Sequence, residues 1–155
     1  MRSAEVRLRQ AGLVESCEAV RARMQALVDE FASAFRKPWP IHLVLQDRPP
    51  YRTVPPCRTL RWRLPGRDGR GQSMIVLVRS EKGLAVLNGL PAAVRRLFLE
   101  FDRRAAVLNL EHELLRLELR ELEQFSAYLR DWRDAGRRPA VEADAASGKP
   151  VTVRI

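Results

Sequence analysis

The residues of this chain best suited to a chemical task are the arginines in the stretch 58–71, which reads RTLRWRLPGRDGRG. On a strand, Arg61 and Arg63 would project from one face, and Leu60 and Trp62 from the other. Arginine carries a planar fork of donors that fits phosphate oxygens and stacks on bases. The pattern therefore suits a surface that holds a sugar–phosphate backbone. The alternative is an ordinary half-buried strand with a solvated outer face.

Further candidate contacts flank this strand. Arg58 has the parity of the apolar set, so it would point with that set unless it lies outside the strand. A loop with four prolines precedes the strand, and a loop with three glycines, which permits close backbone approach, follows it. Tyr51, in the first loop, would offer a stacking surface to a single strand. The predicted nucleic-acid-binding residues are Arg48, Tyr51, Arg52, Arg58, Arg61, Arg63, Arg67 and Arg70.

The distribution of charge indicates an anionic partner. The chain has 28 Lys and Arg residues against 19 Asp and Glu residues, a net charge of +9. Residues 36–79 hold ten of these cations and two of the acids, a net charge of +8, whereas the rest of the chain holds 18 cations against 17 acids. The excess therefore lies in the segment that contains the candidate strand and its two loops.

No catalytic, metal-binding or cofactor-binding pattern accompanies these arginines. The GRDGRG element lacks the Lys-Ser/Thr pair of a P-loop and the glycine spacing of a dinucleotide fold. His112 has no HExxH or HxxxH partner and lies far from His42 in the sequence, so we interpret both as structural. Acidic residues at 111–123 are interleaved with Arg116 and Arg120 at helical spacings, as is typical of surface ion pairs. We therefore expect no catalytic residue, no metal and no cofactor.

Hydrophobic periodicity predicts the elements that position these residues. An apolar stripe at spacings of four and three predicts a helix over 3–35, and a heptad repeat predicts a long helix over 91–135, ended by Gly136. Short β-branched or alternating runs predict strands at 41–45, 58–64 and 74–78. The stripe residues of the first helix are Leu13, Cys17, Val20, Met24, Leu27, Phe31 and Ala34. The heptad seam of the long helix comprises Val94, Phe98, Phe101, Ala105, Leu108, His112, Leu115, Leu119, Leu122 and Leu129.

These elements predict an α+β fold in which a small antiparallel sheet of three or four strands packs on an antiparallel pair of long amphipathic helices. We expect a single domain over 1–135, followed at 136–155 by a linker whose last residues could add an edge strand. An unbroken helix over 91–135 would be roughly 65 Å long, much longer than the first helix. Either a break near Asn109 or a self-associating overhang would account for the difference. The seam over 94–129 could then hold a homodimer or a larger nucleoprotein complex.

Composition indicates a cytoplasmic globular protein. Of the 155 residues, 46% are hydrophobic and 30% are charged, which is typical of a chain that buries a core. The longest apolar runs are too short to cross a bilayer, and the charged N-terminal segment does not resemble a secretory signal, so we expect no membrane association. Cys17 and Cys57 lack CxxC spacing. We interpret them as reduced thiols, with a single disulfide as the alternative.

Two motifs resemble an uncharacterised family of small proteins encoded on integrating conjugative elements and plasmids. The first is the LRWR strand, and the second is a helix with an LP..VR..L pattern. The resemblance covers residues 59–120, and the chain departs from it in the proline-rich loop and beyond residue 125. Genes of this family tend to lie beside those for a single-strand-binding protein and a topoisomerase, which implies DNA handling or maintenance of the element. The matching residues are Leu60, Arg61, Trp62, Arg63, Leu90, Pro91, Val94, Arg95, Leu97, Arg103, Leu108 and Asn109.

The resulting hypothesis is a non-catalytic, nucleic-acid-binding accessory protein of a mobile genetic element. It would hold DNA backbone phosphates on the arginine-rich strand and the glycine–arginine loop. The alternative is an interaction or inhibitor subunit that acts on a larger complex through its heptad-patterned helices and its basic face. The sequence leaves open DNA against RNA, and single against double strands.

Overall fold

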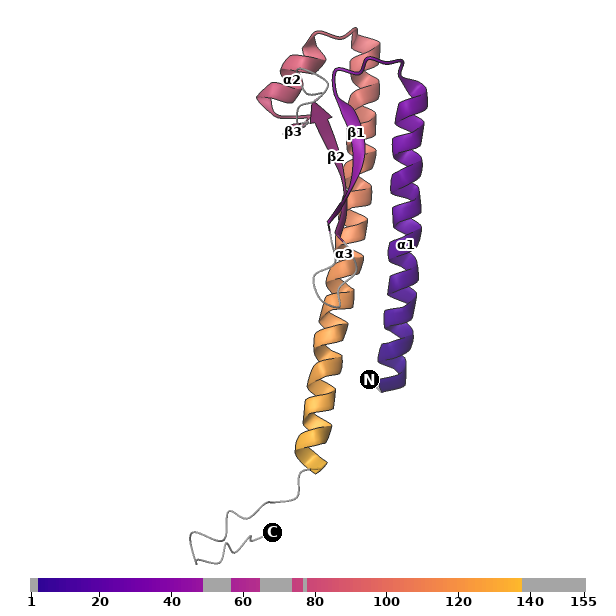
Figure 1. Cartoon of the computed structure of the whole chain (residues 1–155), viewed down its shortest axis with the longest axis vertical. Helices are drawn as coiled ribbons and strands as arrows, with labels where there is room; N and C mark the ends of the chain where they lie inside the picture. The colour runs from indigo at the N-terminus through magenta and orange to yellow at the C-terminus, as the bar shows by residue number, and fades with distance from the viewer. Residues whose placement is uncertain (1–2, 49–56, 65–73, 77, 138–155) are drawn as a thin grey trace, which may run out of the picture.

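The computed structural model describes residues 3–48, 57–64, 74–76 and 78–137. Within these ranges the fold is α+β, as predicted, and helix dominates it. Figure 1 shows two long helices running antiparallel side by side, with the sheet and a short helix toward one end of the molecule. The elements in chain order are α1 (Ser3–Ala34), β1 (His42–Arg48), β2 (Cys57–Leu64), β3 (Met74–Val76), α2 (Glu81–Asn88) and α3 (Ala92–Arg137).

Helix α1 buries one stripe of its surface against α3 and the sheet. Ala34, the last residue of the predicted stripe, is exposed because it lies in the final turn, where the chain leaves for β1. Val6 is buried and extends the stripe by about two turns toward the N-terminus. The other predicted stripe residues are all buried: Leu13, Cys17, Val20, Met24, Leu27 and Phe31.

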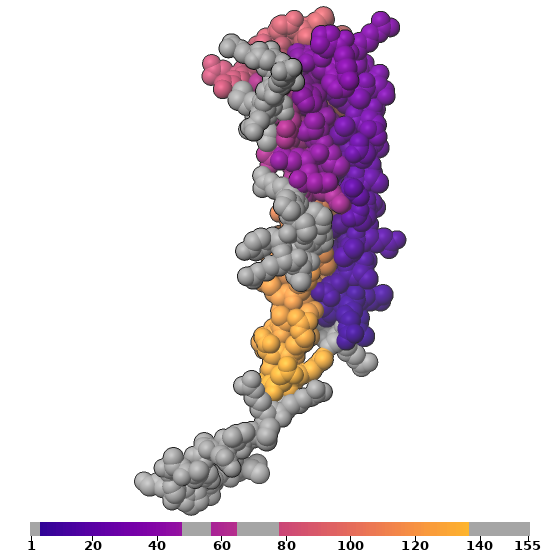
Figure 2. Space-filling view, in the orientation of Figure 1, coloured from indigo at the N-terminus to yellow at the C-terminus, as the bar shows by residue number. Residues whose placement is uncertain are grey.

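Helix α3 is continuous, which excludes the first of the two alternatives, a break near Asn109. The predicted end at Gly136 is wrong, because the helix continues to Arg137. Asn109 does not disturb the helix because its amide is bound by the sheet. Glycine costs a helix interior about 1 kcal/mol relative to alanine, and the last turn tolerates this cost. With 46 and 32 residues, α3 and α1 are roughly 69 Å and 48 Å long. The C-terminal end of α3 therefore extends past the N-terminal end of α1 (Figures 1 and 2).

The sheet is antiparallel, in the order β1-β2-β3. The predicted bounds of β1 are wrong by three residues at its C-terminal end, because Gln46, Asp47 and Arg48 continue the pairing with β2. Pairing, more than the side chain's own preference, decides strand length here. β3 ends at Val76, and Val78 lies in the turn that follows, so the third strand is shorter than predicted. β1 contacts α1, and β2 contacts α3.

Helix α2 is an element that the periodicity did not predict, because eight residues carry too short a pattern. Ser80 caps its start, with its Oγ accepting a hydrogen bond from the Gly83 N–H at 3.3 Å. Leu87 from this helix is fully buried in the core. The signals that could have found it are a Ser at the N-cap and Gly89 just past the end.

The core joins α1, β2 and α3 through aromatic rings. The Phe31 ring of α1 lies 5.3 Å from the Trp62 ring of β2, and 5.5 Å and 5.4 Å from the Phe98 and Phe101 rings of α3. All three contacts are edge-to-face, the arrangement favoured by the ring quadrupoles. Trp62 therefore belongs to the core, and β2 is held with its other face turned away from the helices.

Candidate nucleic-acid interface

The β1–β2 hairpin has two chemically different faces. The register pairs Leu43 with Trp62 and Leu45 with Leu60, and these side chains pack toward the helices. The alternate residues project from the opposite face, which we call the outer face. Among the residues whose side chains are described, the outer face of β1 and β2 carries His42, Val44, Gln46, Cys57, Thr59, Arg61 and Arg63.

Arg61 and Arg63 are neighbours on the outer face, as predicted from their spacing. Arg61 lies opposite Val44 and Arg63 opposite His42, and all four side chains are half-buried. No carboxylate lies among the described side chains of this face. No ion pair or hydrogen bond joins the Arg61 side chain to another residue of the described ranges. Arg61 therefore stands on the outer face with no described acid to neutralise it.

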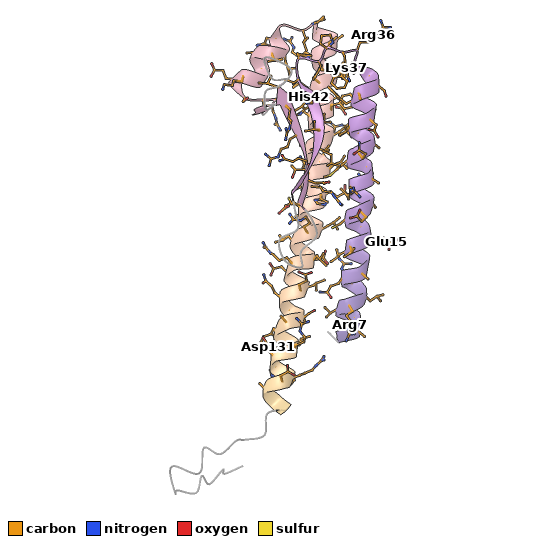
Figure 3. The ribbon with its side chains drawn as sticks, in the orientation of Figure 1. Arg7, Glu15, Arg36, Lys37, His42 and Asp131 are labelled. Atoms are coloured by element: carbon orange, nitrogen blue, oxygen red, sulfur yellow. The ribbon has the colours of Figure 1, made fainter. Side chains whose placement is uncertain are left out.

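His42 lies beside Arg63 on the outer face, and its imidazole is neutral at neutral pH. Burial lowers the pKa of its imidazole, and the Arg63 guanidinium lowers it further. Arg36, Lys37 and His42 lie at the same end of the molecule (Figure 3). Arg36 and Lys37 are exposed, and the Lys37 Nζ stands 5.0 Å from the centre of the Trp39 ring.

Arg58 has a structural role instead of a place on the outer face. It points with the apolar set, as its parity in the strand requires, and its side chain is 11% exposed. Its guanidinium donates to Glu18 of α1 at 2.8 Å and to Asp47 of β1 at 3.0 Å. The hydrogen bond from Arg58 also lowers the pKa of the Glu18 carboxyl. Two carboxylates thus occupy the donors that a phosphate would need.

The remaining predicted contacts lie beyond the described side chains. Arg48 ends β1 in the structure, and Tyr51, Arg52, Arg67 and Arg70 lie outside the described residues. Their loops join the hairpin at opposite ends of β2, because one connects Arg48 to its partner Cys57 and the other follows Leu64.

Arginines at the α1–α3 interface are neutralised by acids across it. Arg104 forms a two-pronged pair with Glu30 at 2.6 Å and 2.5 Å, and Arg23 pairs with Glu111 at 2.7 Å and 2.9 Å. Arg9 pairs with Glu118 at 2.6 Å. The hydrogen bond from Arg104 lowers the pKa of Glu30. The charge of this part of the molecule is thus balanced locally.

Two polar residues of α3 hold β2 in place, and the sequence did not reveal this role. The Trp62 Nε1–H donates to Oδ1 of Asp102 at 3.0 Å. Asn109, one heptad further along α3, hydrogen-bonds both main-chain groups of Leu60. Arg61 is the residue between these two anchored positions, so its backbone is fixed from both sides. The available signal was a pair of polar residues seven apart beside the apolar seam.

The same contacts give three of the motif residues a structural role. Leu60, Trp62 and Asn109 all serve to join β2 to α3. The residues at these motif positions therefore hold β2 against α3, and their contacts are those of packing.

The described residues offer no metal centre. No group of three or more His, Cys, Asp or Glu side chains gathers within them. Cys17 and Cys57 are free thiols, and burial raises the pKa of Cys17. His112 is buried in the α3 seam, and His42 lies on the outer face of β1. None of the helices in the described ranges combines the length and hydrophobicity that a membrane crossing requires.

Comparison with known proteins gives no relative from which a fold or a function could be transferred to this chain. No protein-family model matches the chain, and neither a curated protein nor a solved structure matches it.

Proposed function

We propose that this chain is a nucleic-acid-binding protein without catalytic activity, and that it holds the backbone phosphates of DNA on the outer face of the hairpin. Arg61 and Arg63 form the inner contacts. The observation that carries the proposal is that no ion pair or hydrogen bond joins the Arg61 side chain of the outer face to another described residue, in a molecule whose interhelical arginines are paired with acids. Arg48, Arg52, Arg67 and Arg70 serve as outer contacts, and Tyr51 as a stacking surface.

Arg58 is not among these contacts. Its donors are engaged by Glu18 and Asp47, so it supports the strand that carries Arg61 and Arg63. Backbone recognition of this kind gives little base specificity. The resemblance to proteins of conjugative elements supports a further proposal, that the chain is an accessory protein of a mobile genetic element acting in the cytoplasm.

Fluorescence anisotropy with a labelled single strand and a labelled duplex, over a salt series, tests this function. We expect the logarithm of the affinity to fall by about 0.7 to 0.9 per phosphate contact for each tenfold rise in salt. The Arg61→Ala/Arg63→Ala variant should lower the slope by the equivalent of about two contacts.

The matched control is Arg9→Ala/Arg23→Ala, which removes the same charge from α1, where both arginines are ion-paired. Its slope should remain that of the parent chain. An absence of binding at about 50 mM salt, or equal slopes for the two double variants, would refute the proposal.

A second candidate function is protein–protein interaction. The predicted surface for it, the seam over 94–129, is buried within one chain between Phe98 and Leu119, so that part of it is already occupied. Leu122 and Leu129 of the seam are half-buried. The observation that favours this candidate is instead the opposite face of α3, where large apolar side chains are exposed. A salt-insensitive assembly that binds no nucleic acid would favour it over the first proposal.

A further inference from the structure

Helix α3 is apolar on two opposite faces. The first is the buried seam. The second, which we call the outer stripe, lies about 200° away, because Leu110 is two positions from both Leu108 and His112, which are buried. The exposed members of the outer stripe are Leu99, Val107, Leu110, Leu114, Leu117, Phe125, Tyr128 and Trp132.

This stripe is too long and too regular for scattered surface residues. Leu110, Leu114 and Leu117 recur at spacings of four and three, and their exposed fractions are 62%, 57% and 44%. A groove of about 410 Å³ runs beside it, lined by Leu99, Val107 and Leu110 together with Arg79 and Asp102. Contiguous exposed apolar surface of this kind marks an interaction site.

The stripe continues onto the part of α3 that extends beyond α1 (Figures 1 and 2). Glu118 pairs with Arg9 near the start of α1, so Tyr128 and Trp132, ten and fourteen residues further along α3, lie on this part. They are 61% and 68% exposed. A solvated helix end would carry polar residues on all sides. The described residues of the chain leave these aromatic side chains largely exposed to solvent, which indicates that another molecule packs on them.

We propose that a second copy of this chain covers the outer stripe, with the two α3 helices antiparallel about a two-fold axis beside position 112. In this register Leu110 lies opposite Leu114 of the second copy, and Val107 lies opposite Leu117 of the second copy. Leu99 lies opposite Phe125 of the second copy, so that ring enters the groove beside Leu99. Every one of these pairs joins apolar to apolar, as a helix–helix seam requires.

Charge complementarity selects this register and direction. Two charged residues interrupt the outer stripe: Arg103, which is paired with Glu100 at 2.7 Å, and Glu121, which lies 3.4 Å from Arg120. Their side chains are still 69% and 58% exposed, so each can also face a charge of the second copy. The antiparallel register that pairs the leucines also places Arg103 opposite Glu121 of the second copy, twice per dimer. A parallel dimer would instead place each of them opposite its own kind, which is unfavourable.

The outer ends of the stripe fit the same register. Tyr128 lies opposite Arg96 of the second copy, a pairing that allows a cation–π contact. Trp132, the largest side chain of the stripe, lies opposite Ala92, one of the smallest. The projecting end of α3 thus lies along the end of the second copy that carries α2.

The acids nearest the axis do not oppose the dimer. Glu111 and Glu113 flank position 112 and would approach their own copies. Glu111 is paired with Arg23 at 2.7 Å, and Glu113 with Arg116 at 2.9 Å, within one chain. Each of these acids would therefore meet its copy as part of an ion pair, which reduces the repulsion between them.

The inference goes beyond the proposed function and does not depend on it, since the outer stripe shares no residue with the outer face of the hairpin. Sedimentation equilibrium of the full chain, without nucleic acid, should give a dimer. The Leu110→Glu/Leu114→Glu variant should be a monomer with an unchanged far-ultraviolet circular dichroism spectrum, because both side chains are exposed in the single chain. The matched control is Leu8→Glu/Val14→Glu, which alters exposed apolar residues of α1 and should remain a dimer.

Charge exchange tests the register. Arg103→Glu and Glu121→Arg should each weaken dimerisation by about tenfold or more, because each creates two like-charge contacts. The double variant restores opposite charges and should recover most of the parent affinity. Failure of the double variant to recover would overturn the proposed register.

A spin label at Asp131→Cys, in a Cys57→Ser background, tests the direction of the two helices. Asp131 lies near the projecting end of α3 (Figure 3). Residue 131 is 19 positions from the axis, so the antiparallel dimer predicts roughly 57 Å between the two labelled positions, at 1.5 Å per residue. A parallel dimer would bring the labels to about one helix diameter, roughly 10 Å. A short distance, or a parent chain that stays monomeric at about 100 μM, would overturn the proposal.

Discussion

Asn109 of α3 binds Leu60 of β2 as a neighbouring strand would. Its Oδ1 accepts the Leu60 N–H at 2.8 Å, and its Nδ2 donates to the Leu60 carbonyl oxygen at 3.0 Å. Leu60 precedes the stretch of β2 that pairs with β3, which begins at Trp62. A single amide side chain thus satisfies both main-chain polar groups of a buried residue that would otherwise need a strand partner.

Replacement of Asn109 by alanine should lower the free energy of unfolding by about 2 to 3 kcal/mol, because two main-chain groups lose their partner. The loss should appear although alanine is the better helix former. Urea unfolding of Asn109→Ala beside Asn88→Ala measures it, since Asn88 is exposed and its side chain meets Arg95 at 3.3 Å. A loss no larger than that of the Asn88 variant would contradict a clamping role for Asn109.

Replacement of Arg58 by methionine separates stability from nucleic-acid binding. We expect the free energy of unfolding to fall by about 1 to 2 kcal/mol, because Glu18 and Asp47 are both more than half exposed and can rehydrate when the guanidinium is removed. The salt dependence of DNA affinity should stay that of the parent chain. A lower slope, like that of the Arg61→Ala/Arg63→Ala variant, would show that Arg58 contacts the nucleic acid.

The fold could largely be predicted because its helices follow long periodic patterns. The stripe of α1 and the seam of α3 each repeat over many turns, and local sequence was enough to place residues such as Met24 and Phe98 in the core. Helix α2 and the extra residues of β1 were missed because they depend on a cap and on pairing with β2. These are contacts between segments, which periodicity does not encode.

The candidate site could be predicted only in part, for a related reason. Alternation placed Arg61 and Arg63 on one face, and the structure agrees. It could not show that Arg58 meets an acid 40 residues away on α1, or that Asn109 reaches β2. The outer stripe of α3 was overlooked because the stronger heptad seam on the other face dominates the same sequence.

Phe31 should be the most sensitive single position of the core. Its ring contacts Trp62, Phe98 and Phe101, so Phe31→Ala removes contacts to both β2 and α3 and should cost about 3 to 5 kcal/mol. Leu97→Ala is the control, because Leu97 is exposed on α3 and lies outside the outer stripe. Thermal unfolding of both variants measures the difference. Equal midpoints would contradict the central place of Phe31.

Stability should fall as the pH drops below about 6.5, the usual value for histidine, because His112 is buried as a neutral group. Burial lowers the pKa of its imidazole, and the neighbouring cations Arg116 and Arg58 lower it further against the weaker opposite effects of Glu113 and Glu18. The unfolded chain therefore binds a proton at a higher pH than the folded chain does. Stability is complete above the unfolded pKa and declines as the pH falls from there toward the folded pKa.

His112→Leu should remove most of this decline, because leucine fills the buried site without a titrating group. Melting temperatures at pH 7.5, 6.5 and 5.5 for the parent chain, His112→Leu and His42→Gln apportion the effect between the two histidines, since burial also lowers the pKa of His42. The Glu18 and Glu30 carboxyls have lowered pKa values and act at more acidic pH, so they leave this window clear. If His112→Leu keeps the full decline of the parent chain, the buried imidazole is not its source.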